Sequence, residues 1–546
     1  MKGFPSKKTN LIFFLCLFLF LLLTFKNPFS KRTLIPNFEP YPDTFHYINP
    51  ALSFVKGEGF KMGREGREIK VNVPPMYSLS LIPAFLIKPD PRMAYYANLF
   101  LAFISLFLFW AILKKLFINK LILYSLLILY ISNYFIYFVP SIILAENLTL
   151  TLYLTVLFFF ISKTTVLNSV LTIACAVGLY ATKYANIPLT TTVILLSFAK
   201  AFFIKITLKQ KIKLALIISA TFILAYLTLQ IYEQNTKGRS TIGQFYEHIS
   251  SIYKSSSYSA LEAKKANIPK WFGTQYVNIN LPMYFRSLLG LPNRFLWDNT
   301  PLVPNFIAIG GIIGILMNIF VRKFRFISFI LLSLISSTVI FMSTFYSFDA
   351  RYIYIAIPSL LIGFGLFLST LENRIFTQRR KLLHILIVIF MGIYLLTSFI
   401  RIKSQISLNL RYAETPWNYI AVLKMNEFFT MNKIIDGKKP VLISALPPFL
   451  IDYYSNGNYT LLPLSYEQEF RDIKEVVWGP NDYSDLSKLY SKYLKEGFKV
   501  YVSRAGLGNE SYTNRDFNDI VSKFKTEIVI KGCYDQCNIY SVALRE

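Results

Sequence analysis

Isolated acids and bases beside long apolar runs are the residues of this sequence best suited to chemistry, because ionisable groups near lipid are costly. The first such stretch is PDTFHY at 42–47. If residues 43–55 are helical, Asp43, His46 and Tyr47 stand at positions i, i+3 and i+4 and share one face. A carboxylate and an imidazole on one face could accept a proton or bind a ligand. Asp43 could equally cap the helix, because Pro-Asp-Thr resembles a helix start.

Three further ionisable residues lie at the ends of apolar runs. Glu146 precedes the fourth run, Lys183 follows the fifth, and Arg351 lies between the ninth and tenth. Each also has an ordinary explanation. Glu146 could complement a helix dipole, Lys183 could extend toward water, and Arg351 could pair with Asp349. Taken together, two acids and two bases on one membrane face would suit an anionic, lipid-linked substrate.

Apolar runs are the elements that must position these residues. The chain has 54% hydrophobic and 16% charged residues, whereas soluble proteins have about 25% charged residues. This composition therefore disfavours a soluble or a disordered chain. Since lipid offers no hydrogen bonds to the backbone, unbroken runs of this length indicate helices and not the alternating strands of a barrel. Eleven spans are predicted near 10–25, 96–113, 121–139, 147–162, 166–182, 185–199, 214–232, 305–321, 326–346, 352–370 and 383–400.

The lysines and arginines of the short loops predict the orientation, because positive residues stay on the cytoplasmic side. With a cytoplasmic N-terminus, every short loop agrees, and the first run is expected to be an anchor and not a cleaved signal peptide. The apolar segment 77–87 is too short to span and is expected to lie along the interface. The cytoplasmic set is Lys2, Lys7, Lys8, Lys114, Lys115, Lys120, Lys163, Lys200, Lys205, Lys209, Lys211, Lys213, Arg322, Lys323, Arg325, Arg374, Arg379, Arg380 and Lys381.

The net charge of +28 is concentrated in the first 400 residues, because residues 401–546 hold 19 Lys and Arg against 17 Asp and Glu. This basic excess follows the topology and does not indicate a nucleic-acid partner. In this topology every acid of residues 1–400 except Glu372 faces outside. Acid chemistry is therefore expected at the outer surface.

Three regions outside the membrane are long enough to matter: loop 26–95, loop 233–303 and a C-terminal domain at 401–546. Residues 1–400 are expected to form the membrane domain. The C-terminal region alternates β-rich runs with helical stretches, which predicts a small extracytoplasmic α/β domain. The predicted strands are 441–445, 499–503, 526–530 and 538–544, and the predicted helices are 417–433, 484–496 with Gly497 as its C-cap, and 514–525.

Two cysteines and two loop arginines each allow two interpretations. Cys533 and Cys537 bracket a predicted turn and could form a disulfide or remain free thiols. Arg286 and Arg294 lie among aromatic residues of loop 233–303. They could meet a phosphate, or they could belong to an ordinary interfacial belt.

Several spaced motifs resemble a known family. They are Asp43 with Tyr47, Ala51 and Gly57, the pair Pro74-Pro75 with Tyr77, Glu146 before the fourth run, Gly178-Leu179 before Lys183, and Arg351-Tyr352 with Pro358. In this order and topology they resemble the GT-C glycosyltransferases, and among these the bacterial protein-mannosyltransferase-like and aminoarabinose-transferase-like enzymes. The resemblance covers about residues 10–400. This family usually has Arg at the position of Lys183 and often Asp at that of Glu146, and the WWDxG motif of oligosaccharyltransferases is absent.

This resemblance implies an enzyme of the plasma (inner) membrane. It would transfer a sugar from a polyprenyl-phosphate donor to a lipid, glycan or protein acceptor at the outer face, with inversion. Asp43 would be the base or would orient the acceptor, and Glu146 would share that work. Lys183 and Arg351 would bind the donor phosphate, helped by Arg286 or Arg294.

The same residues and their neighbours are compatible with further roles and with other functions. His46, Tyr47 and Tyr352 would contact the substrates, and His46 with Asp43 and Glu146 could hold a divalent cation, although no metal site is assigned. A transporter or lipid flippase is the alternative, because such proteins also place scarce charges along membrane cavities. A non-catalytic relative of the same scaffold is another.

Overall fold

The apolar runs of the sequence are helical, since the backbone of a chain in lipid must satisfy its own hydrogen bonds. The computed structural model describes residues 7–25, 43–60, 73–203, 207–236, 274–291, 301–345, 348–411, 427–428, 438–445, 459–464, 486–505, 512–531 and 538–545. Two compact units result, and each is described by itself. The helical unit holds 1–27, 74–80 and 95–412, and the second unit holds 28–73, 81–94 and 413–546.

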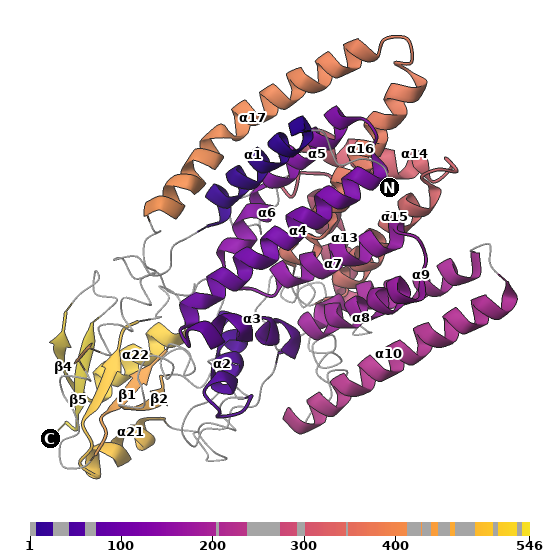
Figure 1. Ribbon diagram of the computed structural model, residues 1–546. Helices are drawn as coiled ribbons and strands as arrows, with labels where there is room; N and C mark the ends of the chain where they lie inside the picture. The colour runs from indigo at the N-terminus through magenta and orange to yellow at the C-terminus, as the bar shows by residue number, and fades with distance from the viewer. Residues whose placement is uncertain are drawn as a thin grey trace. The chain divides into compact units, whose positions relative to one another are not determined.

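The helical unit is a bundle of apolar helices (Figure 1). Its helices are α1 (Lys7–Thr24), α4 (Ala94–Leu116), α5 (Lys120–Ile131), α6 (Tyr134–Phe138), η2 (Val139–Ser141), α7 (Glu146–Ile161), α8 (Val166–Thr182), η3 (Tyr184–Asn186), α9 (Ile187–Phe203), α10 (Leu208–Thr236), α13 (Thr274–Leu288), α14 (Asn305–Asn318), α15 (Arg325–Ser343), η4 (Ala350–Ile353), α16 (Ala356–Arg374) and α17 (Arg380–Arg411).

All eleven predicted spans contain apolar helix, and the chain is a multi-pass membrane protein. Among the described residues, six helices are long and apolar enough to cross a membrane, and a bent pair makes a seventh. Four more of the predicted spans are shorter apolar helices: Leu11–Thr24, Glu146–Ile161, Val166–Thr182 and Asn305–Asn318. The exact number of eleven spans therefore stays a prediction.

The predicted span at 121–139 is not one straight helix. It divides into α5 and α6 with a bend of 58°. Asn133 causes this break, because its side-chain oxygen accepts from the amides of Phe135 and Ile136 and starts a new helix. Its side-chain amide donates to the carbonyl of Leu302, 2.7 Å away, and this bond ties the bend to the segment before α14.

The helix α16 is central to the bundle, because 78% of its apolar span is buried, against 17% for α10 and 22% for α17. Its closest neighbour is α14. Glycines let the two backbones approach, since a Cβ atom on Gly311 would clash with the carbonyl of Leu360 and one on Gly314 with the carbonyl of Gly363. Small residues at such crossings are typical of packed membrane helices.

The second unit contains α2 (Asp43–Val55), most of α3 (Pro75–Ile87), η1 (Pro91–Met93) and a five-stranded sheet with two helices. The strand order is β2-β1-β3-β5-β4, in which β1 pairs in parallel with β2 and β3, and β5 pairs antiparallel with β3 and β4. Their bounds are β1 (Val441–Ser444), β2 (Thr460–Pro463), β3 (Val500–Ser503), β4 (Lys525–Ile530) and β5 (Ile539–Ala543), with α21 (Leu486–Lys495) and α22 (Tyr512–Lys523).

Most of the expected C-terminal elements are present in the described residues. Four strands and two helices lie where the sequence pattern predicts them. Gly497 has a positive φ of 78° after α21, as expected of a C-cap. The strand β2 was not predicted, because Pro463 is atypical of a strand, and it is tolerated here at the sheet edge. The helix α17 continues through Arg411, and the domain boundary at 400/401 stays a prediction.

Candidate functional site

Glu146 is a buried carboxylate at the start of a membrane helix. It is the first residue of α7, and its side chain is 5% exposed. The segment before it contains the short turn η2 and an extended residue, Ile142, so that the chain enters α7 after a sharp change of direction. The free amides at a helix start favour a negative charge, but a buried carboxylate also needs cations as partners.

Lys183 supplies the first cation. The helix α8 ends at Thr182, and Lys183 has extended backbone, with φ −155° and ψ 126°, before the turn η3. This conformation sends its side chain toward Glu146, and the ammonium Nζ lies 2.5 Å from the carboxylate oxygen Oε1. The two residues are far apart in sequence, so this contact is a product of the fold.

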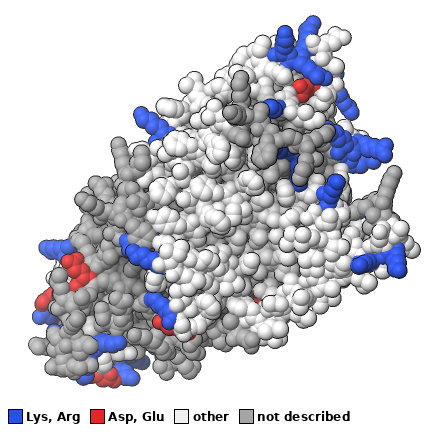
Figure 2. Space-filling model, viewed as in Figure 1, with Lys and Arg blue, Asp and Glu red and all other residues white. Residues whose placement is uncertain are grey.

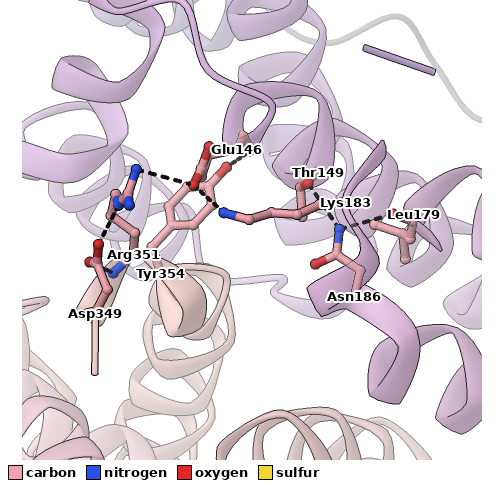
Figure 3. Close-up of polar contacts among 8 residues, drawn as sticks. All are labelled: Glu146, Thr149, Leu179, Lys183, Asn186, Asp349, Arg351 and Tyr354. Atoms are coloured by element: carbon pink, nitrogen blue, oxygen red, sulfur yellow. Dashed lines mark hydrogen bonds and ion pairs between the residues drawn. The ribbon is translucent and has the colours of Figure 1, made fainter. Parts of the chain in front are cut away.

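Arg351 supplies the second cation. It lies in the turn η4, and Asp349 caps this turn by accepting from the Arg351 amide at 2.9 Å. The other oxygen of Asp349 accepts from the guanidinium Nε at 2.6 Å. The terminal nitrogen Nη1 is 3.9 Å from Glu146 Oε1. In Figure 3, Lys183 and Arg351 reach Glu146 from opposite sides.

Tyr352 gives the two cations a shared aromatic neighbour. The ammonium of Lys183 lies 4.6 Å from the centre of its ring, and the guanidinium carbon of Arg351 lies 5.9 Å from it. Such cation–π contacts stabilise a positive charge without neutralising it. The arrangement therefore keeps two cations beside one carboxylate, that of Glu146.

Polar bonds hold the backbone around Glu146 in place. The hydroxyl of Tyr354, which follows η4, donates to the carbonyl oxygen of Glu146. The side-chain amide of Asn147 donates to the carbonyl of Asn98 on α4 at 2.7 Å. Asn98 in turn accepts from the hydroxyl of Tyr77 at 2.7 Å and donates to the carbonyl of Ile142 at 2.6 Å.

A further bond ties α7 to the connection between α8 and α9. The side-chain amide of Asn186 donates to the hydroxyl oxygen of Thr149 at 3.1 Å and to the carbonyl of Leu179 at 2.9 Å (Figure 3). Asn186 belongs to the turn that follows Lys183. The segments carrying Glu146 and Lys183 are thus bonded to each other near the ion pair.

The opposite end of α7 has a different character. There, the ammonium of Lys200 donates to the carbonyl of Phe160 at 2.8 Å, and Lys115 contacts the hydroxyl of Ser162. Cations at a helix C-terminus are favourable. Several lysines and arginines project along the upper right edge of the view in Figure 2. The acid–base cluster and this lysine-rich end therefore lie at the two ends of one helix.

The first-loop residues lie on the predicted helix. The backbone of α2 begins at Asp43, so Asp43, His46 and Tyr47 do share a face. Tyr47 is buried and His46 half-buried, whereas the side chain of Asp43 lies outside the described residues. Gly57 has a positive φ of 78° and ends this helix, so its place in the motif has a structural cause.

The remaining predicted residues are not part of the described ion-pair cluster. Arg286 is exposed in the last turn of α13, a helix that packs against α15. Arg294, Cys533 and Cys537 lie outside the described residues. Among the side chains described, no three His, Cys, Asp or Glu residues gather as metal ligands. Since this leaves out the Asp43 side chain, the divalent-cation hypothesis stays a prediction.

Sequence reasoning missed Asn98, Asn147 and Tyr354 as supports of the cluster. Asn98 and Asn147 could have been noticed in the sequence, because polar amide side chains within apolar runs normally form hydrogen bonds. Tyr354 could not, since its partner Glu146 is 208 positions away in the chain.

Comparisons with known proteins identify the fold. No protein-family model matches the chain, and no curated protein matches it in sequence. Among solved structures, ArnT from Cupriavidus metallidurans in the apo state is similar, with a TM-score of 0.61, 11% identity and coverage of 98% of both chains. The same protein bound to undecaprenyl phosphate gives a TM-score of 0.59, 10% identity and again 98% of both chains.

An archaeal protein has a similar fold. The oligosaccharyltransferase AglB from Archaeoglobus fulgidus, in complex with an inhibitory peptide and a dolichol-phosphate, gives a TM-score of 0.53 at 11% identity. The match covers 91% of this chain and 70% of AglB. ArnT and AglB are both GT-C proteins. The chain therefore has the GT-C glycosyltransferase fold, and the resemblance found in its motifs is confirmed at the level of the fold.

Proposed function

We propose that this chain is an integral-membrane glycosyltransferase of the plasma membrane, which moves a sugar from a polyprenyl-phosphate donor to a lipid, glycan or protein acceptor. The observation that carries the proposal is the cluster of Glu146, Lys183 and Arg351 at one end of α7. The GT-C fold supports it, because one similar structure holds undecaprenyl phosphate and another dolichol-phosphate.

The proposed reaction makes the donor phosphate a leaving group, and negative charge grows on it as the bond to the sugar breaks. Lys183 and Arg351 would stabilise that charge, because fixed cations act strongly in a site that excludes water. Tyr352 would hold the ammonium of Lys183 in place between turnovers. The polyprenyl chain would lie in the bilayer, beside the apolar helices.

On the acceptor side, Asp43 would accept a proton from the attacking group, or orient it, while the configuration at the sugar inverts. Glu146 would position the acceptor or share that work. His46 and Tyr47 share the helix face of Asp43 and would contact donor or acceptor. With a cytoplasmic N-terminus, this site would open to the extracytoplasmic side, as would the C-terminal domain.

The first test is a transfer assay with the purified full-length protein in nanodiscs and a panel of polyprenyl-phosphate sugars. We expect Asp43→Asn to abolish transfer without lowering expression, since losing a general base costs about 10²–10⁴-fold in rate. Lys163→Ala, an exposed residue beyond the other end of α7, is the matched control. Full activity of Asp43→Asn would eliminate the assigned base.

A second variant tests the phosphate role. Arg351→Ala should weaken donor binding more than acceptor binding, because the guanidinium is assigned to the phosphate and not to the acceptor. The KM for each substrate, measured at saturating concentrations of the other, separates the two effects. An unchanged KM for the donor would remove Arg351 from the phosphate site. Donor binding with no transfer to any acceptor would favour a non-catalytic relative.

A further inference from the structure

The charges of the cluster balance without a substrate. Glu146 and Asp349 supply two negative charges, and Lys183 and Arg351 supply two positive charges. Asp349 is committed to Arg351 through two bonds. The ammonium of Lys183, by contrast, has the carboxylate of Glu146 as its anionic partner at 2.5 Å. The position that an anionic ligand would take beside Lys183 is thus occupied by the carboxylate of Glu146.

A phosphate and this carboxylate would compete for the same donor. Both are oxygen anions, and both form short charge-assisted bonds with an ammonium. Adding a phosphate while Glu146 stays in contact would bring two like charges together in a partly buried site, where like charges repel strongly. Opening the Lys183–Glu146 contact would remove this repulsion and free the ammonium for the phosphate.

The backbone of Glu146 is held in place while its side chain and that of Lys183 can turn, and this favours such an exchange. The backbone of Glu146 is held by Tyr354 and, next to it, by the bond between Asn147 and Asn98, so only its side chain needs to turn. Lys183 has a long side chain on an extended segment, and the ring of Tyr352 remains a partner for its ammonium. Asp349 holds Arg351 through two bonds, so Arg351 need not move.

From this geometry we propose that Glu146 is an internal counterion, which the phosphate of the donor displaces from Lys183. The proposal rests on the proposed function and deepens it. The donor site is closed by an ion pair when empty, and phosphate binding releases the carboxylate of Glu146. Donor binding therefore precedes any role of that carboxylate toward the acceptor.

The exchange predicts that removing a charge at the site increases the affinity for an anionic lipid. Glu146→Gln keeps the size of the side chain and removes the competing charge, so it should tighten the binding of an anionic lipid by about tenfold, on the scale of close charge-pair couplings. A carboxylate that only supports the fold would give weaker or unchanged binding when replaced. Lys183→Met should weaken binding by about tenfold or more, because it removes the positive charge that the phosphate would contact.

The experiment uses the full-length protein in nanodiscs of neutral lipid, with a short-chain polyprenyl phosphate that carries no sugar as the probe. Binding is measured by titration for wild type, Glu146→Gln and Lys183→Met. Glu372→Gln is the matched control, because Glu372 contacts Asn119 and His384 at the other end of the bundle. Its affinity should equal that of the wild type.

The outcomes separate the two proposals. Tighter binding by Glu146→Gln, with weaker binding by Lys183→Met, supports the exchange. If Lys183→Met binds weakly and Glu146→Gln is unchanged or weaker, the exchange is overturned and the phosphate site stands. If the wild type does not bind the probe, or Lys183→Met binds it equally well, the phosphate site and the exchange both fall.

A second variant keeps the test decisive where Glu146→Gln does not fold. Glu146→Asp retracts the carboxylate by one methylene group and lengthens its contact with Lys183. It should tighten binding in the same direction by a smaller factor. Unchanged or weaker binding by a folded Glu146→Asp would overturn the exchange.

Discussion

Asn98 connects three separate segments through one amide side chain and its own carbonyl. The side chain joins the hydroxyl of Tyr77 to the carbonyl of Ile142, and the carbonyl accepts from Asn147. Asn98 is fully buried. A buried polar group that loses its partner costs about 1–3 kcal/mol, so this residue matters far more than its small size suggests.

We expect Asn98→Ala to lower the free energy of unfolding by about 2–4 kcal/mol, since it removes the buried bonds of the Asn98 side chain to the hydroxyl of Tyr77 and the carbonyl of Ile142. Thermal unfolding of the full chain in detergent measures the change. Tyr77→Phe is the matched control, because it removes one of these bonds and should cost less. Equal stability of Asn98→Ala and wild type would contradict the assigned bonds.

At the scale of elements, the crossing of α14 and α16 depends on glycine. Gly310, Gly311 and Gly314 on α14 face α16, and Gly363 on α16 faces α14, so the two backbones are in direct contact. Contact of this kind leaves no room for a side chain at the crossing point.

Gly314→Ala should destabilise the bundle by about 1–3 kcal/mol, the usual cost of overpacking, because its Cβ atom would meet the carbonyl of Gly363. Gly392→Ala on α17 is the matched control, since a Cβ there meets nothing within 4 Å. The melting temperatures of both variants in detergent provide the measurement. A Gly314→Ala variant as stable as Gly392→Ala would refute the close crossing.

The sequence predicted elements well wherever the period and length of apolar runs decide the structure. The apolar helices of the eleven predicted spans, the helix α2 and four of the five strands follow from such local patterns, whereas α13 lies in the segment interpreted as loop 233–303. The strand β2 was missed because Pro463 opposes strand propensity, and only its place at the sheet edge permits it. The bend at Asn133 was missed because hydropathy averages over one polar residue, although Asn is a known helix-capping residue.

The site was predictable only in part, for the same physical reason. Glu146, Lys183 and Arg351 stood out because charges near lipid are rare, and the topology placed them on one face. Their individual partners could not be read from the sequence, since Lys183 and Glu146 are 37 positions apart and Tyr354 and Glu146 are 208 apart. Such contacts are set by helix packing and leave no local pattern.

At the largest scale, the helical unit is polarised along α7, with the acid–base cluster at its first residue and lysines near its last turn. A helix of 16 residues is about 24 Å long at a rise of 1.5 Å per residue. The two ends of α7 are therefore separated by most of a bilayer, and they should face different compartments.

Cysteine labelling tests this polarity in cells with an intact plasma membrane. With Cys533 and Cys537 replaced by serine, Asp90→Cys should react with an impermeant maleimide added outside. Lys163→Cys should react only after permeabilisation, because Lys163 belongs to the lysine-rich loops assigned to the cytoplasm. Labelling of Lys163→Cys from outside would reverse the orientation and move the proposed site to the cytoplasm.

The close crossing of α14 and α16 also limits where the proposed polyprenyl donor could enter the bundle. Arg351 lies in the turn just before α16, the most buried of the helices able to span the membrane in the described part of the chain. Lys183 lies between α8 and α9, which pack against the largely exposed α10. If the proposed function holds, an isoprenoid tail should therefore enter on the side of α10, because the glycine contacts leave α14 and α16 no space between their backbones.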